Sequence, residues 1–254
     1  MGVTYTSQGT IGSITLDNPP ANSYDIAFVQ ELAAAIAAAS EDPTARVIAL
    51  RSASEKFFSA GADVKRFLAN EVEANMEMVS SAHEALASIA RSPKLFVACV
   101  TGHALGGGLE MALACDVRYG IEGRFRLGTP EVSLGLLPGN GGTQRLPRLI
   151  GVGPALELLT TGRQLSVDEA HALGILSQVF ASREALDEHV AGLGALPPLA
   201  LAEIKRAVYE GIERPLADGM ALERELVENL FRSQDAHEGL TAFSEKRTPE
   251  FTGS

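Results

Sequence analysis

The stretch Leu95–Glu110, which reads LFVACVTGHALGGGLE, decides the class of fold. Its first part, Leu95–Val100, is an uninterrupted apolar run, which is typical of a strand buried on both faces. A glycine-rich turn at 102–108 follows and opens a helix at about Leu109–Cys115. A strand, a turn and a helix in direct succession predict an α/β protein.

The segments before this stretch repeat the same order of elements. Arg46–Arg51 is a short apolar run bounded by charge, the loop 52–62 follows it, and helical material extends from Asp63 to Arg91. The alternation of residues 3–16 predicts a hairpin with its turn at Gln8–Gly9, and the Ala/Leu/Ile spacing from Tyr24 to Ser40 predicts a helix.

The segments after it predict fewer strands and more helix. Residues 116–119 and 124–127 are expected to pair as strands, residues 129–161 to mix short helices with glycine turns, and residues 178–180 to form a last strand. Pro197–Glu245 is predicted to be helical, with breaks near Pro215 and Gly239. We therefore divide the chain into residues 1–195, which contain all the glycine-rich turns between strands and helices, and a helical region, 196–254.

Composition excludes several classes of protein. With 254 residues, 46% of them apolar and 21% charged, the chain can bury a large core. Its net charge of −11 disfavours a nucleic-acid partner. Cys99 and Cys115 are too few for a disulfide framework and are interpreted as buried thiols in a reducing compartment. No signal peptide or membrane span is recognisable, so the expected location is cytoplasmic.

One candidate for chemistry is the turn Ser59–Asp63, SAGAD, with Asp63 as the cap of the following helix. Small side chains let a ligand approach the backbone, and free N–H groups at a helix start favour an anion or a developing oxyanion. The alternative is an ordinary tight turn.

Two other glycine-containing stretches each place a glutamate at a helix start. In 102–110 the glycine spacing matches neither a dinucleotide fingerprint nor a phosphate-binding loop, so a nucleotide enzyme is not supported, and Glu110 lies just inside the helix. In 128–145, Glu131 follows a proline, and the absence of Gly-x-Ser-x-Gly argues against a serine hydrolase. The alternative for both carboxylates is simple stabilisation by the helix dipole.

Together these motifs resemble the crotonase superfamily, and within it the enoyl-CoA hydratases. The resemblance rests on SAGAD at 59–63, GHALGGGLE at 102–110 and PEVSLGLLPGNGGTQRL at 130–146, and it extends from about residue 14 to residue 247. It implies a spiral of ββα turns and a helical C-terminal region for trimerisation. The sequence departs from the family at Asn18–Tyr24, where a KALNAL-like segment is usual.

The resemblance also implies roles for individual residues. The N–H groups of Ala62 and Gly107 would form an oxyanion hole, and Glu110 and Glu131 would be the catalytic acids. The implied residues that bind substrate or CoA, besides Ala62 and Gly107, are Ala60, Asp63, Val64, Lys65, Gly139, Phe243 and Lys246, the last two reaching a neighbouring subunit. A basic cluster of Lys56, Lys65, Arg66 and Lys246 is expected to hold the anionic CoA.

The function that follows from the resemblance is hydration of a trans-2-enoyl-CoA, in fatty-acid β-oxidation, by a homotrimer or homohexamer. It implies neither a metal nor a cofactor, since the CoA thioester is the substrate. Residues 64–80 and 133–137 are expected to line the acyl tail. Isomerisation of a Δ3-enoyl-CoA is the closest alternative, and an acyl-CoA-binding protein without activity is a second. The presence of both Glu110 and Glu131 favours the hydratase.

Overall fold

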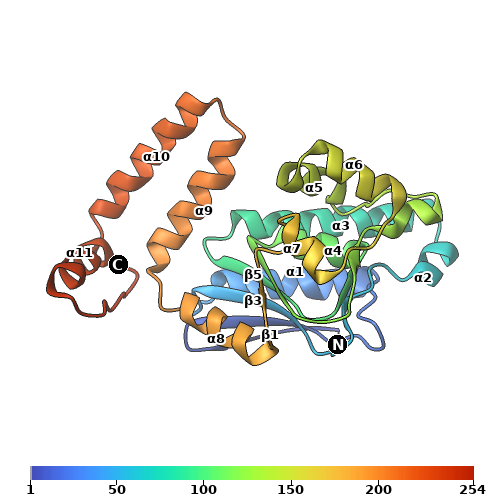
Figure 1. Cartoon of the computed structure of the whole chain (residues 1–254), viewed down its shortest axis with the longest axis horizontal. Coiled ribbons are helices and arrows are strands. Elements are labelled where there is room, and N and C mark those ends of the chain that lie inside the picture. The colour runs from blue at the N-terminus through green and yellow to red at the C-terminus, as the bar shows by residue number, and fades with distance from the viewer. Residues whose placement is uncertain (1) are drawn as a thin grey trace.

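A computed structural model describes residues 2–254, and its strands form two sheets (Figure 1). The larger sheet has the strand order β1-β2-β3-β5-β7-β9 and the smaller has the order β4-β6-β8. The strands of the larger sheet are β1 (Val3–Gln8), β2 (Ile11–Leu16), β3 (Val47–Ser52), β5 (Leu95–Val100), β7 (Val117–Ile121) and β9 (Gln178–Phe180). Those of the smaller sheet are β4 (Phe57–Ser59), β6 (His103–Leu105) and β8 (Leu127–Gly128).

The chain winds between the two sheets in repeated turns. β3, β5 and β7 each run in the larger sheet, and the next strand along the chain, β4, β6 or β8, runs in the smaller one. Helical segments then close each turn: α2 (Val64–Ala69) with α3 (Val72–Arg91), α4 (Gly107–Ala114), and the 3-10 helix η1 (Pro130–Leu134) with α5 (Gly142–Ile150). The predicted crotonase spiral of ββα turns is confirmed.

The central strands β3 and β5 of the larger sheet are buried on both faces, as their apolar runs predict. Along β3, Ile48 and Leu50 join the main core with α1 (Ile26–Glu41) and α3. Val47 and Ala49 point to the opposite face, where α8 (Arg183–Leu193) covers them with Leu186 and Val190. This alternation follows from the two-residue period of a strand. Cys99 and Cys115 are both free and buried, as predicted.

Several predicted local elements are confirmed and others are wrong. The hairpin, the strands at 47–52, 95–100 and 178–180 and the cap at Asp63 are present. The predicted pairing of 116–119 with 124–127 is wrong, because β7 joins β5 and β9 while β8 joins β6. The segment 63–91 is two helices separated at Asn70 and Glu71.

After α6 (Val152–Thr161), α7 (Val167–Ala172) and α8, the chain forms three more helices that we call the C-terminal arm: α9 (Pro198–Ile212), α10 (Leu216–Phe231) and α11 (Gln234–Glu245). The arm projects from the body, and α11 and α2 lie at opposite ends of the molecule (Figure 1). The predicted break near Pro215 is confirmed. The one near Gly239 is wrong, because Ser233 caps α11 and Gly239 lies inside that helix.

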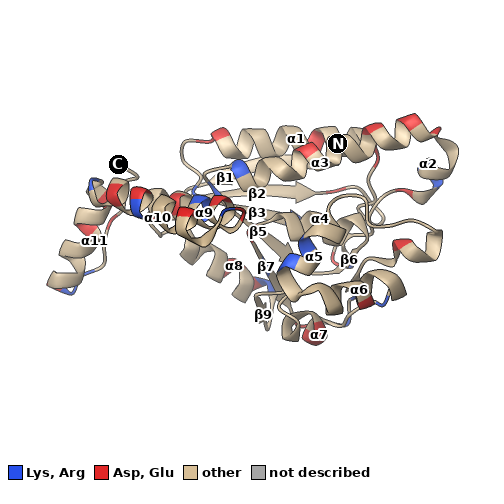
Figure 2. Ribbon diagram, turned by 90° about the horizontal axis from the view of Figure 1, so that it is seen from above, with Lys and Arg blue, Asp and Glu red and all other residues tan. Residues whose placement is uncertain are grey.

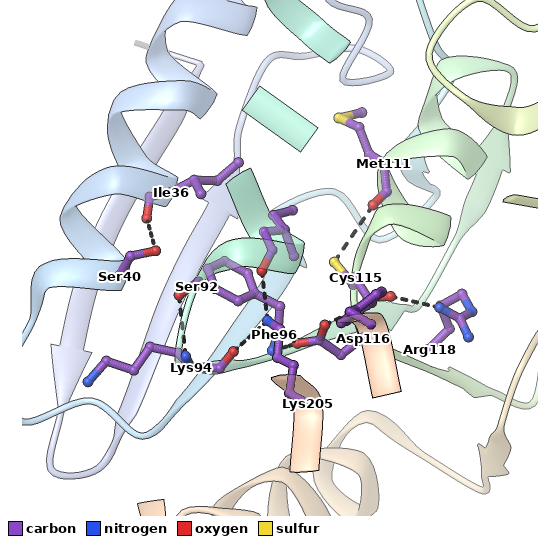
Figure 3. A network of polar contacts seen from close by, with 12 residues as sticks. Ile36, Ser40, Ser92, Lys94, Phe96, Met111, Cys115, Asp116, Arg118 and Lys205 are labelled. Atoms are coloured by element: carbon purple, nitrogen blue, oxygen red, sulfur yellow. Dashed lines mark hydrogen bonds and ion pairs between the residues drawn. The ribbon is translucent and has the colours of Figure 1, made fainter. Parts of the chain in front are cut away.

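A buried ion pair fixes α9 to the body (Figure 3). Lys205 Nζ donates to Asp116 Oδ2 at 2.8 Å and to the carbonyl oxygens of Ile89 at 2.7 Å and Lys94 at 2.8 Å. Asp116 also accepts from the Phe96 N–H and the Tyr209 hydroxyl. Burial lowers the pKa of Lys205 and raises that of Asp116, and each charge counters the shift of the other. Hydrogen bonds around both charges are what make such a buried pair tolerable.

Charged residues lie mainly on the helices and loops, while the strands of the larger sheet are largely uncharged (Figure 2). Large apolar side chains are also exposed along the arm, among them Ile204, Val208, Ile212, Leu216 and Phe231. Of the helices formed by residues 2–254, none combines the length and the apolar character that crossing a membrane requires.

Candidate active site

The centre of the site is the pair Gly106–Gly107, where β6 passes into α4. Gly106 has a φ of +54°, which L side chains rarely adopt, and a Cβ atom there would lie 2.9 Å from Glu131 Oε1. A Cβ atom on Gly107 would lie 1.7 Å from the Tyr24 hydroxyl oxygen. Glycine is therefore required at both positions, because the side chains of Glu131 and Tyr24 lie against the backbone there.

Glu110 extends from the first turn of α4 and is only 1% exposed. Its Oε1 accepts hydrogen bonds from the main-chain N–H groups of Asn140 at 2.8 Å and Gly142 at 2.6 Å. Burial raises the pKa of Glu110, and the two N–H groups and Arg145 oppose that rise. The loop 138–142 therefore holds this carboxylate and favours its charged form.

Glu131 lies in η1, a single 3-10 turn, rather than at the start of an α-helix. Its Oε2 is buried and has no hydrogen-bond partner within residues 2–254. Burial, followed by the charge of Glu110, raises the pKa of Glu131 to about 7. A buried oxygen without a partner is costly, so this atom is available to a ligand or to a proton.

The predicted oxyanion donors lie on two loops that touch each other. Neither the Ala62 N–H nor the Gly107 N–H has a hydrogen-bond acceptor in the described part of the chain. A Cβ atom on Gly61, the residue before Ala62, would lie 3.1 Å from the Gly107 nitrogen. Two unpaired backbone donors beside a pair of carboxylates can stabilise negative charge that develops on a carbonyl oxygen.

Sequence reasoning missed two polar residues of the site, Tyr24 and Asn140. Tyr24 is 4% exposed, and its backbone pairs in parallel with Ala62 through hydrogen bonds to Gly61 and Asp63. Asn140 is 5% exposed, and its side-chain amide donates to the Tyr24 hydroxyl oxygen. Tyr24 lies in the segment that departs from the family pattern, and that departure was the one available signal.

The remaining predicted residues divide between the two ends of the molecule. Ala60, Asp63, Val64 and Lys65 lie on or next to the loop of Ala62, with Asp63 capping α2. Gly139 lies in the loop that holds Glu110, where its carbonyl oxygen contacts His83.

Phe243 and Lys246 lie in and directly after α11, so a single chain does not bring them to the other predicted residues (Figure 1). The predicted basic cluster is accordingly not assembled within one chain, because Lys246 lies at the end of α11. In addition, Arg66 is paired with Asp25 at 3.2 Å and Asp63 at 3.9 Å.

Exposed apolar side chains occur on both segments that were expected to line an acyl tail. They are Val64, Leu68, Val72 and Met76 on α2 and α3, and Leu134, Leu136 and Leu137 in and after η1. Val132, just before the second segment, is exposed as well. Within residues 2–254, no group of three or more His, Cys, Asp or Glu side chains is arranged to hold a metal ion.

Comparison with known proteins finds relatives along the whole chain. The sequence profile of the enoyl-CoA hydratase/isomerase family matches residues 6–254. The human mitochondrial enoyl-CoA hydratase domain-containing protein 2 is 40% identical over 252 residues, which cover 96% of this chain and 86% of the relative.

Solved structures agree with the sequence match. A Geobacillus kaustophilus protein described as "Enoyl-CoA hydrates" superposes with a TM-score of 0.96 at 42% identity, covering 100% of this chain and 97% of that one. The enoyl-CoA hydratase of Bacillus anthracis superposes with a TM-score of 0.95 at 36% identity, with each chain covered completely.

Proposed function

The chain belongs to the enoyl-CoA hydratase/isomerase family, and on that premise we propose that it adds water to a trans-2-enoyl-CoA to give a 3-hydroxyacyl-CoA. The observation that carries the proposal is a pair of carboxylates, the buried Glu110 and the half-buried Glu131 with its buried Oε2, beside two unpaired backbone N–H groups. Hydration of a conjugated thioester needs both parts: donors for an enolate oxygen and two groups that exchange protons.

Substrate polarisation is assigned to Ala62 and Gly107. Their N–H groups would donate to the thioester oxygen, which gains negative charge as an oxygen nucleophile adds at C3. Preorganised donors of this kind are worth several kcal/mol to a transition state, since they need no reorientation when the charge forms.

The environments of the two glutamates suggest different roles for them. Glu110 accepts two main-chain hydrogen bonds that favour its carboxylate, so it is the better base for the attacking water. Glu131 has an unpartnered buried oxygen and a pKa of about 7, so it is the better carrier of the proton that C2 receives. Because the two carboxylates interact, we expect them to titrate in two steps whose pKa values belong to the pair and not to either glutamate alone.

We assign residues to the acyl tail and to CoA from their places in the fold. The apolar side chains of α2, α3 and the η1 region would contact the acyl tail, and Ala60, Asp63, Val64, Lys65 and Gly139 would lie along the CoA thioester. Lys56, next to β4, would contribute to the charge around CoA. Phe243 and Lys246 would come from a neighbouring subunit of a homotrimer or homohexamer. No metal or cofactor takes part in the proposed reaction.

The test is a spectrophotometric assay of crotonyl-CoA, following loss of the absorbance of the conjugated thioester. The wild type should hydrate it, and Glu110→Gln and Glu131→Gln should each lower kcat by at least about 10²-fold with little change in CoA binding. Glu157→Gln, which alters a surface glutamate paired with Arg163, is the control and should keep full activity.

The alternatives give different results in the same experiment. Conversion of a 3-enoyl-CoA to its 2-enoyl isomer without hydration would identify an isomerase. Binding of the thioester with neither reaction would identify an acyl-CoA-binding protein. Full hydration by Glu110→Gln would show that the assignment of Glu110 is wrong.

A further inference from the structure

The Tyr24 hydroxyl is a buried proton donor beside the two glutamates, and the reaction outlined above gives it no role. Burial, followed by the charges of Glu110 and Glu131, raises the pKa of Tyr24 far above its ordinary value. The phenol therefore keeps its proton throughout the working pH range and can act as a neutral hydrogen-bond donor.

Two contacts fix the position of this hydroxyl. The Asn140 side-chain amide donates to the Tyr24 oxygen, and the Cα of Gly107 lies directly against that oxygen. The parallel bridge with Ala62 holds the backbone of Tyr24. The ring of Tyr24 packs near the ring of Phe28, with centroids 6.2 Å apart. The donor is thus preorganised by backbone and side-chain contacts, much as Glu110 is held by two main-chain N–H groups.

The hydroxyl hydrogen itself has no acceptor among residues 2–254. The amide of Asn140 occupies a lone pair of the Tyr24 oxygen, so the O–H bond must point elsewhere. A buried donor without an acceptor costs free energy, and such a group in a native site calls for a partner.

Asn140 links the Tyr24 hydroxyl to Glu110, so an acceptor for this hydroxyl would lie near the glutamates. The main-chain N–H of Asn140 donates to Glu110 Oε1 while its side chain donates to Tyr24, so one residue holds both groups. Gly107 contacts the Tyr24 hydroxyl, and its neighbour Gly106 contacts Glu131, whose Oε2 is unpartnered. A ligand oxygen bound between the glutamates would therefore lie beside the Tyr24 hydroxyl, a side-chain donor in addition to the two backbone N–H groups.

We propose that Tyr24 is a further catalytic residue, whose hydroxyl donates a hydrogen bond to the oxygen that joins or leaves C3 of the acyl group. This rests on the proposed function, because that oxygen is the attacking water in hydration and the 3-hydroxyl group in the reverse reaction. Tyr24 keeps its proton and forms no covalent bond. It fixes the direction of attack and stabilises the oxygen as it departs in the reverse reaction.

The experiment compares Tyr24→Phe with Tyr5→Phe. Tyr5 is the matched control, because its hydroxyl bonds Asp42 in the region of the β1–β2 hairpin, away from the glutamates. Both variants remove one hydroxyl and keep the ring. We expect Tyr24→Phe to lower kcat for crotonyl-CoA by about 10- to 100-fold, with KM within about threefold, and Tyr5→Phe to leave both unchanged.

A binding measurement separates a contact with oxygen from a change of cavity shape. Acetoacetyl-CoA carries an oxygen acceptor on C3 and butyryl-CoA carries none, and neither has a double bond to hydrate. The ratio of their Kd values should shift about tenfold against acetoacetyl-CoA in Tyr24→Phe alone. The ratio does not depend on the folded fraction of a preparation, so it remains valid if the variant is less stable.

Each outcome has one meaning. Equal weakening of both thioesters, or no change in the ratio, would overturn the assignment of Tyr24, whatever happens to kcat. A wild type that binds both thioesters but does not hydrate crotonyl-CoA would instead contradict the proposed function. In that case a shifted ratio would still report a Tyr24 contact with a C3 oxygen.

Discussion

The main-chain N–H of Gly142 donates a hydrogen bond of 2.6 Å to Glu110 Oε1, so a carboxylate on α4 is held by the first residue of α5. Glu131 has no comparable donor for its Oε2. Two identical side chains in one site therefore differ in surroundings, because two main-chain N–H groups favour the charged form of Glu110 while Oε2 of Glu131 is buried without a donor. This difference predicts how activity depends on pH.

Hydration should slow as the pH rises above about 7. Glu131 must hold a proton to deliver it to C2, and it loses that proton around its pKa of about 7. The reverse reaction needs Glu131 without its proton, so dehydration of a 3-hydroxyacyl-CoA should speed up over the same range. Rates measured in both directions between pH 5.5 and 9 check this. Hydration that stays constant across the range would refute the assignment of the acid.

Replacing Glu131 by Gln should make the fold more stable at alkaline pH. The folded protein raises the pKa of Glu131 from 4.5 to about 7, so the proton is held more tightly when folded. This contribution is present below about pH 4.5 and is lost as the pH rises to about 7. Glutamine does not titrate, so the variant does not lose stability as the pH rises. It should therefore be more stable than the wild type at pH 8, by on the order of 1 kcal/mol after solvent screening.

Denaturant unfolding of wild type and Glu131→Gln at pH 5 and pH 8 measures this difference. The gap between the two proteins should shrink toward pH 5. Glu122→Gln, at an exposed glutamate, is the control and should follow the wild type. A constant gap at both pH values would show that the substitution acts through packing rather than through the charge.

Lys205→Met should destabilise the protein by about 3–5 kcal/mol, because it leaves the Asp116 carboxylate buried without its cation. Arg206→Met is the matched control on the same helix. Arg206 forms an exposed pair with Glu210, and losing it should cost less than about 1 kcal/mol. Equal losses for the two variants in denaturant unfolding would mean that the buried pair does not hold α9 to the body.

The C-terminal arm shows where sequence reasoning reached its limit. Apolar residues recur at helical spacing along α10, among them Leu216, Met220, Leu222, Leu226 and Leu230, yet the structure buries Leu222 and Leu226 and exposes Leu216 and Met220. Periodicity reports that a face is apolar, but it does not identify what covers that face. Lys205 gave no signal either, because its partners come from distant segments of the chain.

The body and the site were more predictable because their determinants are local. Apolar runs, turn glycines and Asp63 each act within a few residues, so the order of strands, turns and helices could be predicted from the residues. The spiral of ββα turns was predicted from the family resemblance. Glu110 and Glu131 were found from motifs, whereas the contact of Tyr24 with Gly107 and Asn140 depends on three separate segments meeting. The predicted pairing of 116–119 with 124–127 was wrong for a similar reason. The two segments are neighbours in sequence but join different sheets, and this depends on distant parts of the chain.

The exposed apolar face of the arm predicts self-association. Phe231 is 71% exposed and Leu216 is 79% exposed, and a symmetric assembly is the usual way to cover such surface. Light scattering should give three or six times the chain mass of 26.7 kDa. Phe231→Glu should lower that mass, while Leu68→Glu, which charges an exposed apolar residue on α2, should not. A wild type with the mass of one chain would refute the prediction.

Ala62→Pro tests the oxyanion hole without removing a structural hydrogen bond. The Ala62 N–H has no acceptor in the described chain, and the bridge with Tyr24 uses Gly61 and Asp63 instead. Proline lacks the N–H and is tolerated near a helix start, so the variant should fold and still bind CoA. Its kcat should fall by roughly 10²–10³-fold, the usual loss for one such donor.

Ala60→Pro provides the contrast, because the Ala60 N–H donates to the Ala21 carbonyl oxygen at 2.9 Å. That variant should lose stability as well as activity, whereas Ala62→Pro should lose activity alone. Gly107→Pro is a poor probe, since any Cβ there meets the Tyr24 oxygen. Thermal unfolding, CoA binding and kcat are measured together for both variants. A folded, CoA-binding Ala62→Pro protein with unchanged kcat would mean that the thioester oxygen is held by other donors.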